Sequence, residues 1–239
     1  MHLSSADPLH WSWQAFKQFA KEYEPDFTVD LGDLASWGVI SSYNRGVFRK
    51  LEGRRIAQEY KLMNRELDEI QKFSPSHTLL QGNHDVWIDE YIDLHPELEG
   101  MLEYETNLRL HERGIKFVPL PQQPWQCGKL SMLHGWWCGA NAAKKHLTML
   151  GGSLVHGHVH KFATACQKNF ADGSYWQATS IGCLCDTRPT YQRARVTDHV
   201  NGFALLYMQP KTLDFSLVPV YMDRERGFIV EGVKYGIRG

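Results

Sequence analysis

Four short apolar segments of this chain each end beside a glycine and a side chain that can bind a metal ion. Ligands of α/β sheets bind outside the carboxyl ends of the strands, and glycine lets the backbone turn sharply there. We therefore expect the four ends to surround one shared site. The segments cover residues 27–31, 77–81, 130–133 and 153–156, and the motifs that follow them are Gly32-Asp33, Gly82-Asn83-His84-Asp85, His134-Gly135 and Gly157-His158-Val159-His160.

The first half of the chain predicts helices alternating with strands. Apolar residues recur at helical spacing after Asp7-Pro8, where Asp7 would cap a helix and Pro8 would take its first position. A second amphipathic helix is expected over residues 47–73, between the strands at 27–31 and 77–81. A strand, a helix and a second strand joined by short links predict a right-handed crossover and a parallel strand pair.

The second half of the chain shifts towards strands. Helices are expected over residues 102–112 and 140–150, and Gly151 would stop the second of them. No repeat, low-complexity tract or linker divides the sequence, so we expect a single α/β domain over residues 1–239. Further strands are expected over residues 116–119, 175–184, 202–208 and 213–222.

Each motif taken alone has an ordinary interpretation. A Gly-Asp pair is usually a turn, a single histidine such as His134 is more often a hydrogen-bonded core residue, and Gly-Asn-His-Asp also suits a turn. The pair His158 and His160 is more specific, because side chains two residues apart on a strand point the same way. The ordinary interpretation fails for the ordered set, because four independent turns would not each carry a metal-binding group at a strand end.

The ordered set of motifs resembles the calcineurin-like metallophosphoesterases, which include protein Ser/Thr phosphatases, purple acid phosphatases, cyclic-nucleotide phosphodiesterases and DNA-repair nucleases. The resemblance implies an α/β fold, a two-sheet mixed β sandwich flanked by helices. It also implies a hydrolase of phosphate esters in which two divalent metal ions between the sheet ends activate a water molecule. Mixed nitrogen and oxygen ligands favour Mn, Fe, Zn, Co or Ni over Ca.

The resemblance also implies a role for each motif residue. Asp33 would bridge the two metal ions. His84 would lie beside the leaving group and protonate it, and Asp85 would orient His84. The remaining ligands would be Asn83, His134 and His158 for one metal ion, and His2 and His160 for the other.

The first motif of the family, Asp-x-His, is incomplete in this sequence. If His2 is its histidine, the partner aspartate would precede Met1: either the sequence starts at a methionine inside the motif, or the protein lacks that strand. His10 is a competing candidate, but its spacing from Asp7 does not fit the motif. We expect the metal ion held by His2 and His160 to bind more weakly than its neighbour, because it has lost a carboxylate ligand.

Charge and hydrophobicity exclude several classes of protein. The 26 Lys and Arg nearly balance 27 Asp and Glu, which excludes a strongly basic nucleic-acid-binding surface but not a local basic patch. No run of 18 apolar residues predicts a membrane span, and the N-terminus lacks the features of a signal peptide. Five cysteines, an odd number, predict free thiols in a reducing cytoplasm. Cys183 and Cys185 have the wrong spacing for a zinc knuckle and are expected to be buried free thiols.

Aromatic and basic side chains near the motifs suggest a substrate class. Trp87 and Trp136 would stack on a planar leaving group or, alternatively, fill the core. Arg188 belongs to an Arg-rich loop that would hold phosphate or, alternatively, form a solvated face. These residues favour a phosphate diester, nucleotides and nucleic acid included, over a monoester. The alternative function is a non-catalytic scaffold that keeps the fold with an impaired metal site, and the sequence does not indicate an oligomeric state.

Overall fold

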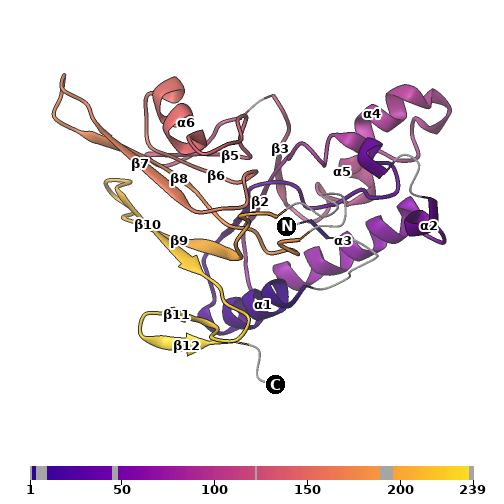
Figure 1. Cartoon of the computed structure of the whole chain (residues 1–239), viewed down its shortest axis with the longest axis horizontal. Coiled ribbons are helices and arrows are strands. Elements are labelled where there is room, and N and C mark those ends of the chain that lie inside the picture. Colours follow the sequence, from indigo (N-terminus) through magenta and orange to yellow (C-terminus); the bar gives the residue numbers. More distant parts are fainter. Residues whose placement is uncertain (1, 4–9, 45–47, 122, 189–195, 237–239) are drawn as a thin grey trace.

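The computed structural model describes residues 2–3, 10–44, 48–121, 123–188 and 196–236. Three parallel strands form the first sheet, in the order β1-β2-β3 (Figure 1). Their pairing confirms the predicted parallel arrangement of the first two strands, and the third extends the same sheet. The strands are β1 (Thr28–Asp30), β2 (His77–Leu80) and β3 (Lys116–Val118).

A second sheet has five strands in the order β4-β5-β6-β8-β7. Its centre is parallel, since β5 pairs with β6 and β6 with β8, whereas the outer strands β4 and β7 run antiparallel to their neighbours. The carboxyl ends of β5 and β6 therefore lie at one edge of this sheet. The strands are β4 (Trp125–Cys127), β5 (Leu130–Leu133), β6 (Leu154–His156), β7 (Ala163–Lys168) and β8 (Tyr175–Ser180).

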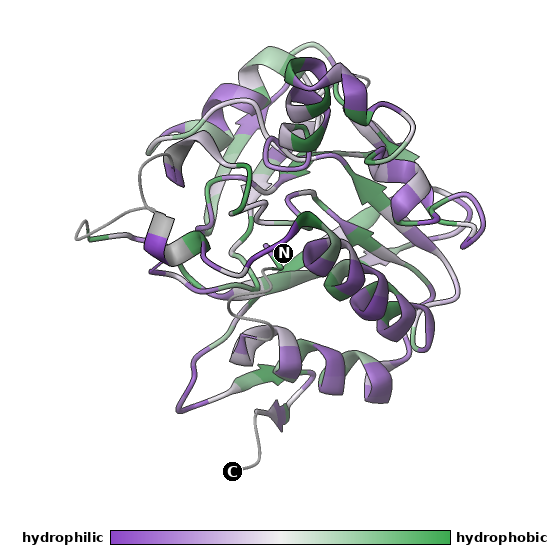
Figure 2. Cartoon of the chain, turned by 90° about the vertical axis from the view of Figure 1, so that its right-hand side faces the viewer, coloured by the Kyte–Doolittle hydropathy of each residue, from purple (hydrophilic) through white to green (hydrophobic). Residues whose placement is uncertain are grey.

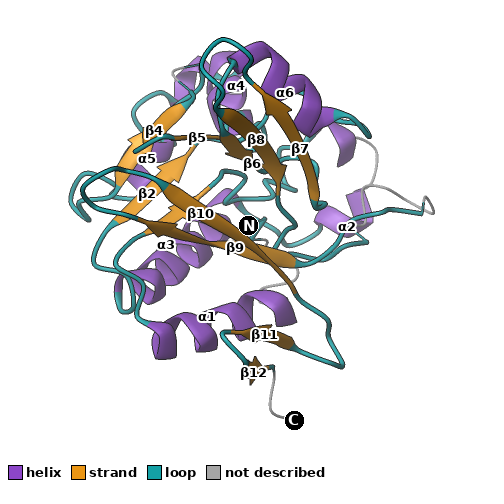
Figure 3. Cartoon of the chain, turned by 90° about the vertical axis from the view of Figure 1, so that its left-hand side faces the viewer, coloured by secondary structure: helices purple, strands orange, loops and turns teal. Residues whose placement is uncertain are grey.

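Two antiparallel hairpins complete the strands. The longer hairpin, β9 (Gly202–Met208) with β10 (Phe215–Tyr221), crosses the face of the molecule that Figure 3 turns to the viewer. The shorter hairpin, β11 (Phe228–Val230) with β12 (Val233–Tyr235), lies beside helix α1. The predicted mixed α/β class is confirmed, although β4, β7, β11 and β12 were not expected from the sequence.

The two main sheets pack face to face. Leu80 and Val118 of the first sheet share a buried apolar cluster with Leu130, Met132 and Val155 of the second. Burial of such side chains is worth roughly 1.5–3 kcal/mol each, so this cluster stabilises the sandwich strongly. Because the sheets meet here, their strand ends are brought to a common edge.

Helices cover the outer faces of the two sheets. Figure 2 shows strands rich in apolar residues inside and helices rich in polar residues around them. Helices α1 (Trp11–Tyr23) and α3 (Ile56–Gln71) pack on the first sheet, and buried Glu66 joins them by accepting hydrogen bonds from Trp13 Nε1 at 2.8 Å and Lys17 Nζ at 2.6 Å. Helix α6 (Ala142–Leu150) covers the second sheet. The shorter helices are α2 (Phe48–Leu51), α4 (Trp87–Leu94) and α5 (Tyr104–Asn107), with 3₁₀ turns at Ser42–Asn44 and Pro96–Leu98.

Two predicted helix boundaries are wrong. The single helix expected over residues 47–73 is divided into α2 and α3, because Gly53 adopts a positive φ of 76°. The helix expected over residues 102–112 is helical only in α5 and continues as turns. Helix α1 begins at Trp11, and His10 caps it through Nδ1, which accepts a hydrogen bond from Ser12 N at 3.4 Å. Asp7 and Pro8 lie outside the described residues.

Candidate metal centre

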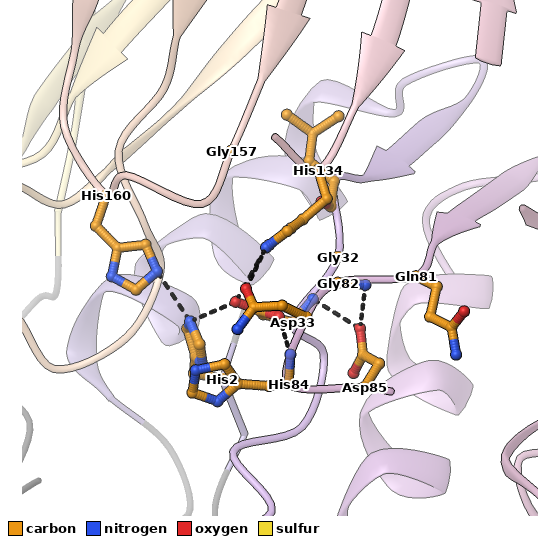
Figure 4. Close-up of polar contacts among 12 residues, drawn as sticks. His2, Gly32, Asp33, Gln81, Gly82, His84, Asp85, His134, Gly157 and His160 are labelled. Carbon is orange, nitrogen blue, oxygen red and sulfur yellow. Dashed lines mark hydrogen bonds and ion pairs between the residues drawn. The ribbon is translucent and has the colours of Figure 1, made fainter. Parts of the chain in front are cut away.

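The four predicted motifs converge at the edge where the two sheets meet (Figure 4). Asp33 and His84 follow the ends of β1 and β2, and His134 follows the end of β5. His160 lies in the turn after β6. Residues from four separate segments of the chain therefore surround one centre, as the sequence predicted.

Asp33 lies in the middle of this group and is 2% exposed. Its Oδ2 is 3.2 Å from His2 Nε2 and 3.3 Å from His134 Nε2. Its Oδ1 accepts a hydrogen bond from the backbone nitrogen of His84 at 2.8 Å. One carboxylate oxygen therefore lies between two imidazoles, while the other ties the β1 motif to the β2 motif.

His134, Asn83 and His158 lie on one side of Asp33. His134 Nδ1 donates to the carbonyl oxygen of Leu31 at 2.7 Å, and this bond fixes the ring with Nε2 directed at the centre. That Nε2 is 3.0 Å from Asn83 Oδ1. The rings of His134 and His158 are 5.0 Å apart between centroids. The three residues predicted to share one metal ion are therefore neighbours.

His2 and His160 lie on the other side of Asp33. Their Nε2 atoms are 2.9 Å apart, and His2 Nε2 contacts both His160 and the Asp33 carboxylate (Figure 4). His160 is 9% exposed, and its Nδ1 is buried with no hydrogen-bond partner among the described residues. The pair predicted to share the second metal ion is thus also assembled.

Two glycines allow the strand ends to approach so closely. A Cβ at Gly82 would overlap the backbone nitrogen and Oδ1 of Asp33. A Cβ at Gly32, where φ is 100°, would lie 2.7 Å from His134 Nδ1. Four of the candidate ligands also have left-handed backbone conformations, which are strained for residues other than glycine and concentrate at functional sites. These are His2, Asp33, His158 and His160, with φ values of 57°, 56°, 66° and 56°.

The electrostatics of the centre keep most of its imidazoles neutral. Burial lowers the pKa of His2 to about 3 and that of His158 to about 4, and it holds the pKa of His160 well below its usual range. Burial alone would raise the pKa of Asp33, but the charges and hydrogen bonds of His134 and His2 outweigh it and keep this pKa well below its usual range. The centre therefore offers neutral imidazole nitrogens and an ionised carboxylate, which are the forms that bind metal ions.

This donor set fits a cation. With its proton on Nδ1, the lone pair of His134 Nε2 faces two further acceptor atoms, Asn83 Oδ1 and Asp33 Oδ2. Acceptors at such distances repel one another unless positive charge lies between them. Burial alone would lower the pKa of His134, but Asp33 outweighs this and raises it, which reflects the same demand for positive charge. The residues present therefore suit divalent metal ions with mixed nitrogen and oxygen ligands.

His84 lies at the edge of the centre and is held by its neighbours. Its ring stacks on Trp87, with 4.0 Å between centroids and an interplanar angle of 26°, and the edge of the His2 ring is 4.5 Å away. A backbone hydrogen bond with Ser36 also acts on the imidazole. Trp87, which the sequence suggested as a platform for substrate, therefore packs against His84 and positions it.

The carboxylate of Asp85, which the resemblance predicts to orient His84, lies among backbone groups of the two motifs. Asp85 is completely buried, and its carboxylate accepts hydrogen bonds from backbone N–H groups at the ends of β1 and β2 and from the Tyr104 hydroxyl. It therefore joins the two metal-binding motifs, and its role in orienting His84 stays a prediction. The donors are Gly82 N at 2.8 Å, Asp33 N at 2.7 Å, Leu34 N at 3.3 Å, Ala35 N at 3.2 Å and Tyr104 Oη at 3.1 Å.

Replacing Asp85 by alanine should lower the free energy of unfolding by at least about 3 kcal/mol, because each buried donor left without an acceptor costs roughly 1–3 kcal/mol. Urea unfolding with a chelator present measures this without a contribution from bound metal. Asp89→Ala is the matched control, because this carboxylate accepts one side-chain hydrogen bond, from Gln81 Nε2. A loss no larger than that of Asp89→Ala would contradict the role given to Asp85.

Several residues that shape the centre were missed by the sequence analysis. Gln123 donates from Nε2 to the carbonyl of Gln81 at 2.9 Å and accepts from the backbone nitrogen of His134 at 2.7 Å, so it joins the ends of β2 and β5. The ring of His199 lies 4.7 Å from that of His160. Cys185 has Sγ within 4.8 Å of ligand nitrogens of His2 and His160. A lone glutamine or histidine has no spacing signal, and the spacing of Cys183 and Cys185 predicted only buried free thiols, so the fold alone places these residues beside the centre.

The residues predicted to bind substrate lie at the surface. Trp136 is 40% exposed, and its backbone nitrogen donates to His146 Nε2 at 2.9 Å. Arg188 is exposed, three residues beyond Cys185. Most of the Arg-rich loop, residues 189–195, lies outside the described residues. Contact of Trp136 or Arg188 with substrate stays a prediction.

A cavity of about 630 Å³ opens beside the centre. His2, Asp33 and His134 line one end, and apolar residues of α1 and β9 line the other. None of the described residues that line it is Lys or Arg. Lys and Arg side chains of the described residues therefore do not balance the Asp33 carboxylate within this cavity, which agrees with a site for metal ions.

Comparison with models of known protein families gives a match to most of the chain. The family model described as calcineurin-like phosphoesterase matches residues 9–162, which include the motifs from Asp33 to His160 but not His2. A search of curated proteins found no significant match to the chain. No helix in the described part of the chain is long and apolar enough to cross a bilayer.

Proposed function

Because the chain belongs to the calcineurin-like phosphoesterase family, we propose that it hydrolyses phosphate esters with two divalent metal ions and prefers diesters to monoesters. The observation that carries this proposal is the position of Asp33 Oδ2 between His2 Nε2 and His134 Nε2. One carboxylate with a separate imidazole group on each side is the arrangement that two neighbouring cations need.

We assign the ligands in two groups that share Asp33. Asn83, His134 and His158 hold one cation, and His2 and His160 hold the other. Bound metal ions supply Lewis acidity and lower the pKa of water. The chain itself supplies orientation: the Leu31 carbonyl sets the His134 ring, and the Asp85 carboxylate holds the two motif backbones in register.

His84 would act on the leaving group. Burial lowers the pKa of His84, and the charge of Asp33 works against that effect. The negative charge of a bound phosphate would favour the imidazolium further, because an opposite charge nearby stabilises the charged form. Stacking on Trp87 keeps the ring at one orientation, so its proton is held at the edge of the centre for the departing oxygen.

Trp136 and Arg188 support the diester preference. The exposed indole of Trp136, beside the β5 motif, can stack on a planar leaving group. The exposed guanidinium of Arg188 can bind phosphate through two parallel hydrogen bonds. Nucleotides and nucleic acid fall within this class of substrate. The single-domain organisation over residues 1–239 and the cytoplasmic location stay predictions of the sequence.

The test compares bis(p-nitrophenyl) phosphate with p-nitrophenyl phosphate after a chelator has been replaced by Mn²⁺, Zn²⁺, Co²⁺ or Ni²⁺. We expect kcat/KM to be at least about tenfold higher for the diester, which is about 1.4 kcal/mol of discrimination. Arg188→Ala should reduce that ratio while two cations per chain remain. A higher kcat/KM for the monoester would overturn the preference, and a chain that binds no cation and cleaves neither ester would be a scaffold.

A further inference from the structure

Cys185 lies beside the half of the centre that contains His2 and His160. One ligand atom from each of these three residues lies within 4.8 Å of the other two. Cys185 is 7% exposed and carries a free thiol. His160 contributes a second observation, because its Nδ1 is buried with no hydrogen-bond partner among the described residues.

The segment that carries Cys185 is fixed to the start of β9. Asn201 Nδ2 donates to the carbonyl oxygens of Cys185 at 2.7 Å and Cys183 at 3.1 Å. The backbone of Cys183 pairs with the same region, donating to Val200 O at 3.0 Å. A Cβ at Gly182 would overlap that Val200 oxygen, so only glycine permits the approach. These backbone and side-chain hydrogen bonds thus hold the sulfur of Cys185 next to the imidazoles.

Cys183 is held differently. Its Sγ lies 3.6 Å from the carbonyl oxygen of Val200 and 3.9 Å from that of Cys185, and hydrogen bonds to both are formed. It is absent from the three-residue groups of metal-binding side chains among the described residues, whereas Cys185 is present in one of them. The two thiols also contact each other, and the hydrogen bond between them lowers the pKa of Cys183 and raises that of Cys185 well above its usual range. Of the pair, only Cys185 also lies beside His2 and His160 in such a group of described residues.

We propose that Cys185 is a further ligand of the cation held by His2 and His160 and binds it as a thiolate. The inference rests on the proposed two-metal function. On binding, the sulfur loses its proton to solvent and forms a bond to the metal ion, so the thiol releases one proton when a cation binds at this position. A thiolate favours Zn²⁺ or Co²⁺ over Mn²⁺ at this position, because soft ligands select softer cations.

This assignment revises one expectation from the sequence. The cation held by His2 and His160 was expected to bind more weakly than its neighbour because it lacked a carboxylate. A thiolate supplies a negative charge at the same position. With His2, His160, Asp33 and Cys185, that cation has as many protein ligands as its neighbour.

The test is the absorption spectrum of the protein loaded with Co²⁺ under reducing conditions. We expect a thiolate-to-cobalt charge-transfer band in the near-ultraviolet for the unmutated chain. Cys183→Ser is the matched control and should keep the band, whereas Cys185→Ser should lose it. Cys185→Ser should also weaken Zn²⁺ binding at one of the two positions by more than about tenfold, since even residues behind the ligands are worth about 10–100-fold.

The spectrum of the unmutated chain decides the inference even if a variant fails to fold. Two bound Co²⁺ ions with phosphoesterase activity but no charge-transfer band would overturn the role of Cys185 and leave the proposed function intact. A band that persists in Cys185→Ser would assign the thiolate to another cysteine and would also overturn it. Failure of the unmutated chain to bind Co²⁺ at all would overturn the two-metal function itself.

Discussion

Replacing Asp33 by alanine should lower kcat/KM for phosphate esters by about 10³-fold or more and should weaken the binding of both cations. Asp33 is the proposed shared ligand, because one of its oxygens lies between His2 and His134. Metal ions supply several kcal/mol of transition-state stabilisation, and each 1.36 kcal/mol corresponds to about tenfold in rate. Loss of the bridge removes this contribution from both positions at once.

Asp33→Asn separates the charge of Asp33 from its hydrogen bond. An amide oxygen at the same place can still accept a hydrogen bond from the backbone nitrogen of His84. Because the amide is neutral, it does not supply the negative charge that would bridge two cations. We therefore expect the asparagine variant to fold as well as the unmutated chain and to lose activity almost as completely as alanine. Metal analysis of each purified variant, together with steady-state kinetics, measures both effects.

Asp214→Asn is the control for Asp33, because this carboxylate is 65% exposed and pairs with Lys129 at the surface. It should change neither metal content nor rate. If Asp33→Ala kept two tightly bound cations, Asp33 would not be the bridging ligand. The grouping of the ligands into two sets that share it would then have to be abandoned.

Replacing His84 by alanine should lower kcat by about 10²–10⁴-fold while both cations stay bound, because acid catalysis by one side chain is worth about that much. The loss should be largest for alkyl leaving groups, which need a proton, and smallest for p-nitrophenolate, which leaves without one. Kinetics with a series of leaving groups, combined with metal analysis, checks both statements.

His95→Ala is the control for His84. His95 is a partly exposed histidine that pairs with Glu97, and its loss should leave rate and metal content unchanged. His84 also belongs to a group with His2 and Asp33 that could hold a metal ion. Loss of a cation from His84→Ala would therefore show that His84 is a ligand, and its role at the leaving group would be wrong.

The sequence predicted the candidate ligands because their signal is local. Apart from His2, each one stands next to a strand end, and β1, β2, β5 and β6 all formed within the predicted segments. Parallel pairing then brings such ends to the same edge of a sheet. Strand pairing was therefore enough to predict that Asp33 and Asn83 would meet, whereas His134 reaches them from the second sheet through the packing of the two sheets.

The structure also shows choices between partners that the sequence did not specify. The carboxylate of Asp85 is adjacent to His84 in sequence, yet it accepts hydrogen bonds from Asp33 N and Gly82 N, because the two motif backbones converge on it. The stacking of Trp87 on His84 depends on the direction of helix α4. The break between helices α2 and α3 occurs at Gly53, where φ is positive. The spacing of apolar residues does not indicate this change of backbone direction.

What the sequence determined by itself was the kind of chemistry: a carboxylate, an amide and several imidazoles, placed by glycine-flanked turns at strand ends. Tertiary structure decided how these groups are divided and supported. It placed Asp33 between two imidazole groups and Gln123 across the ends of β2 and β5. It also brought Cys185 from beyond β8 to His2 and His160. The physical reason is that backbone turns are set by neighbouring residues, whereas contacts between distant segments are set by the packing of the two sheets.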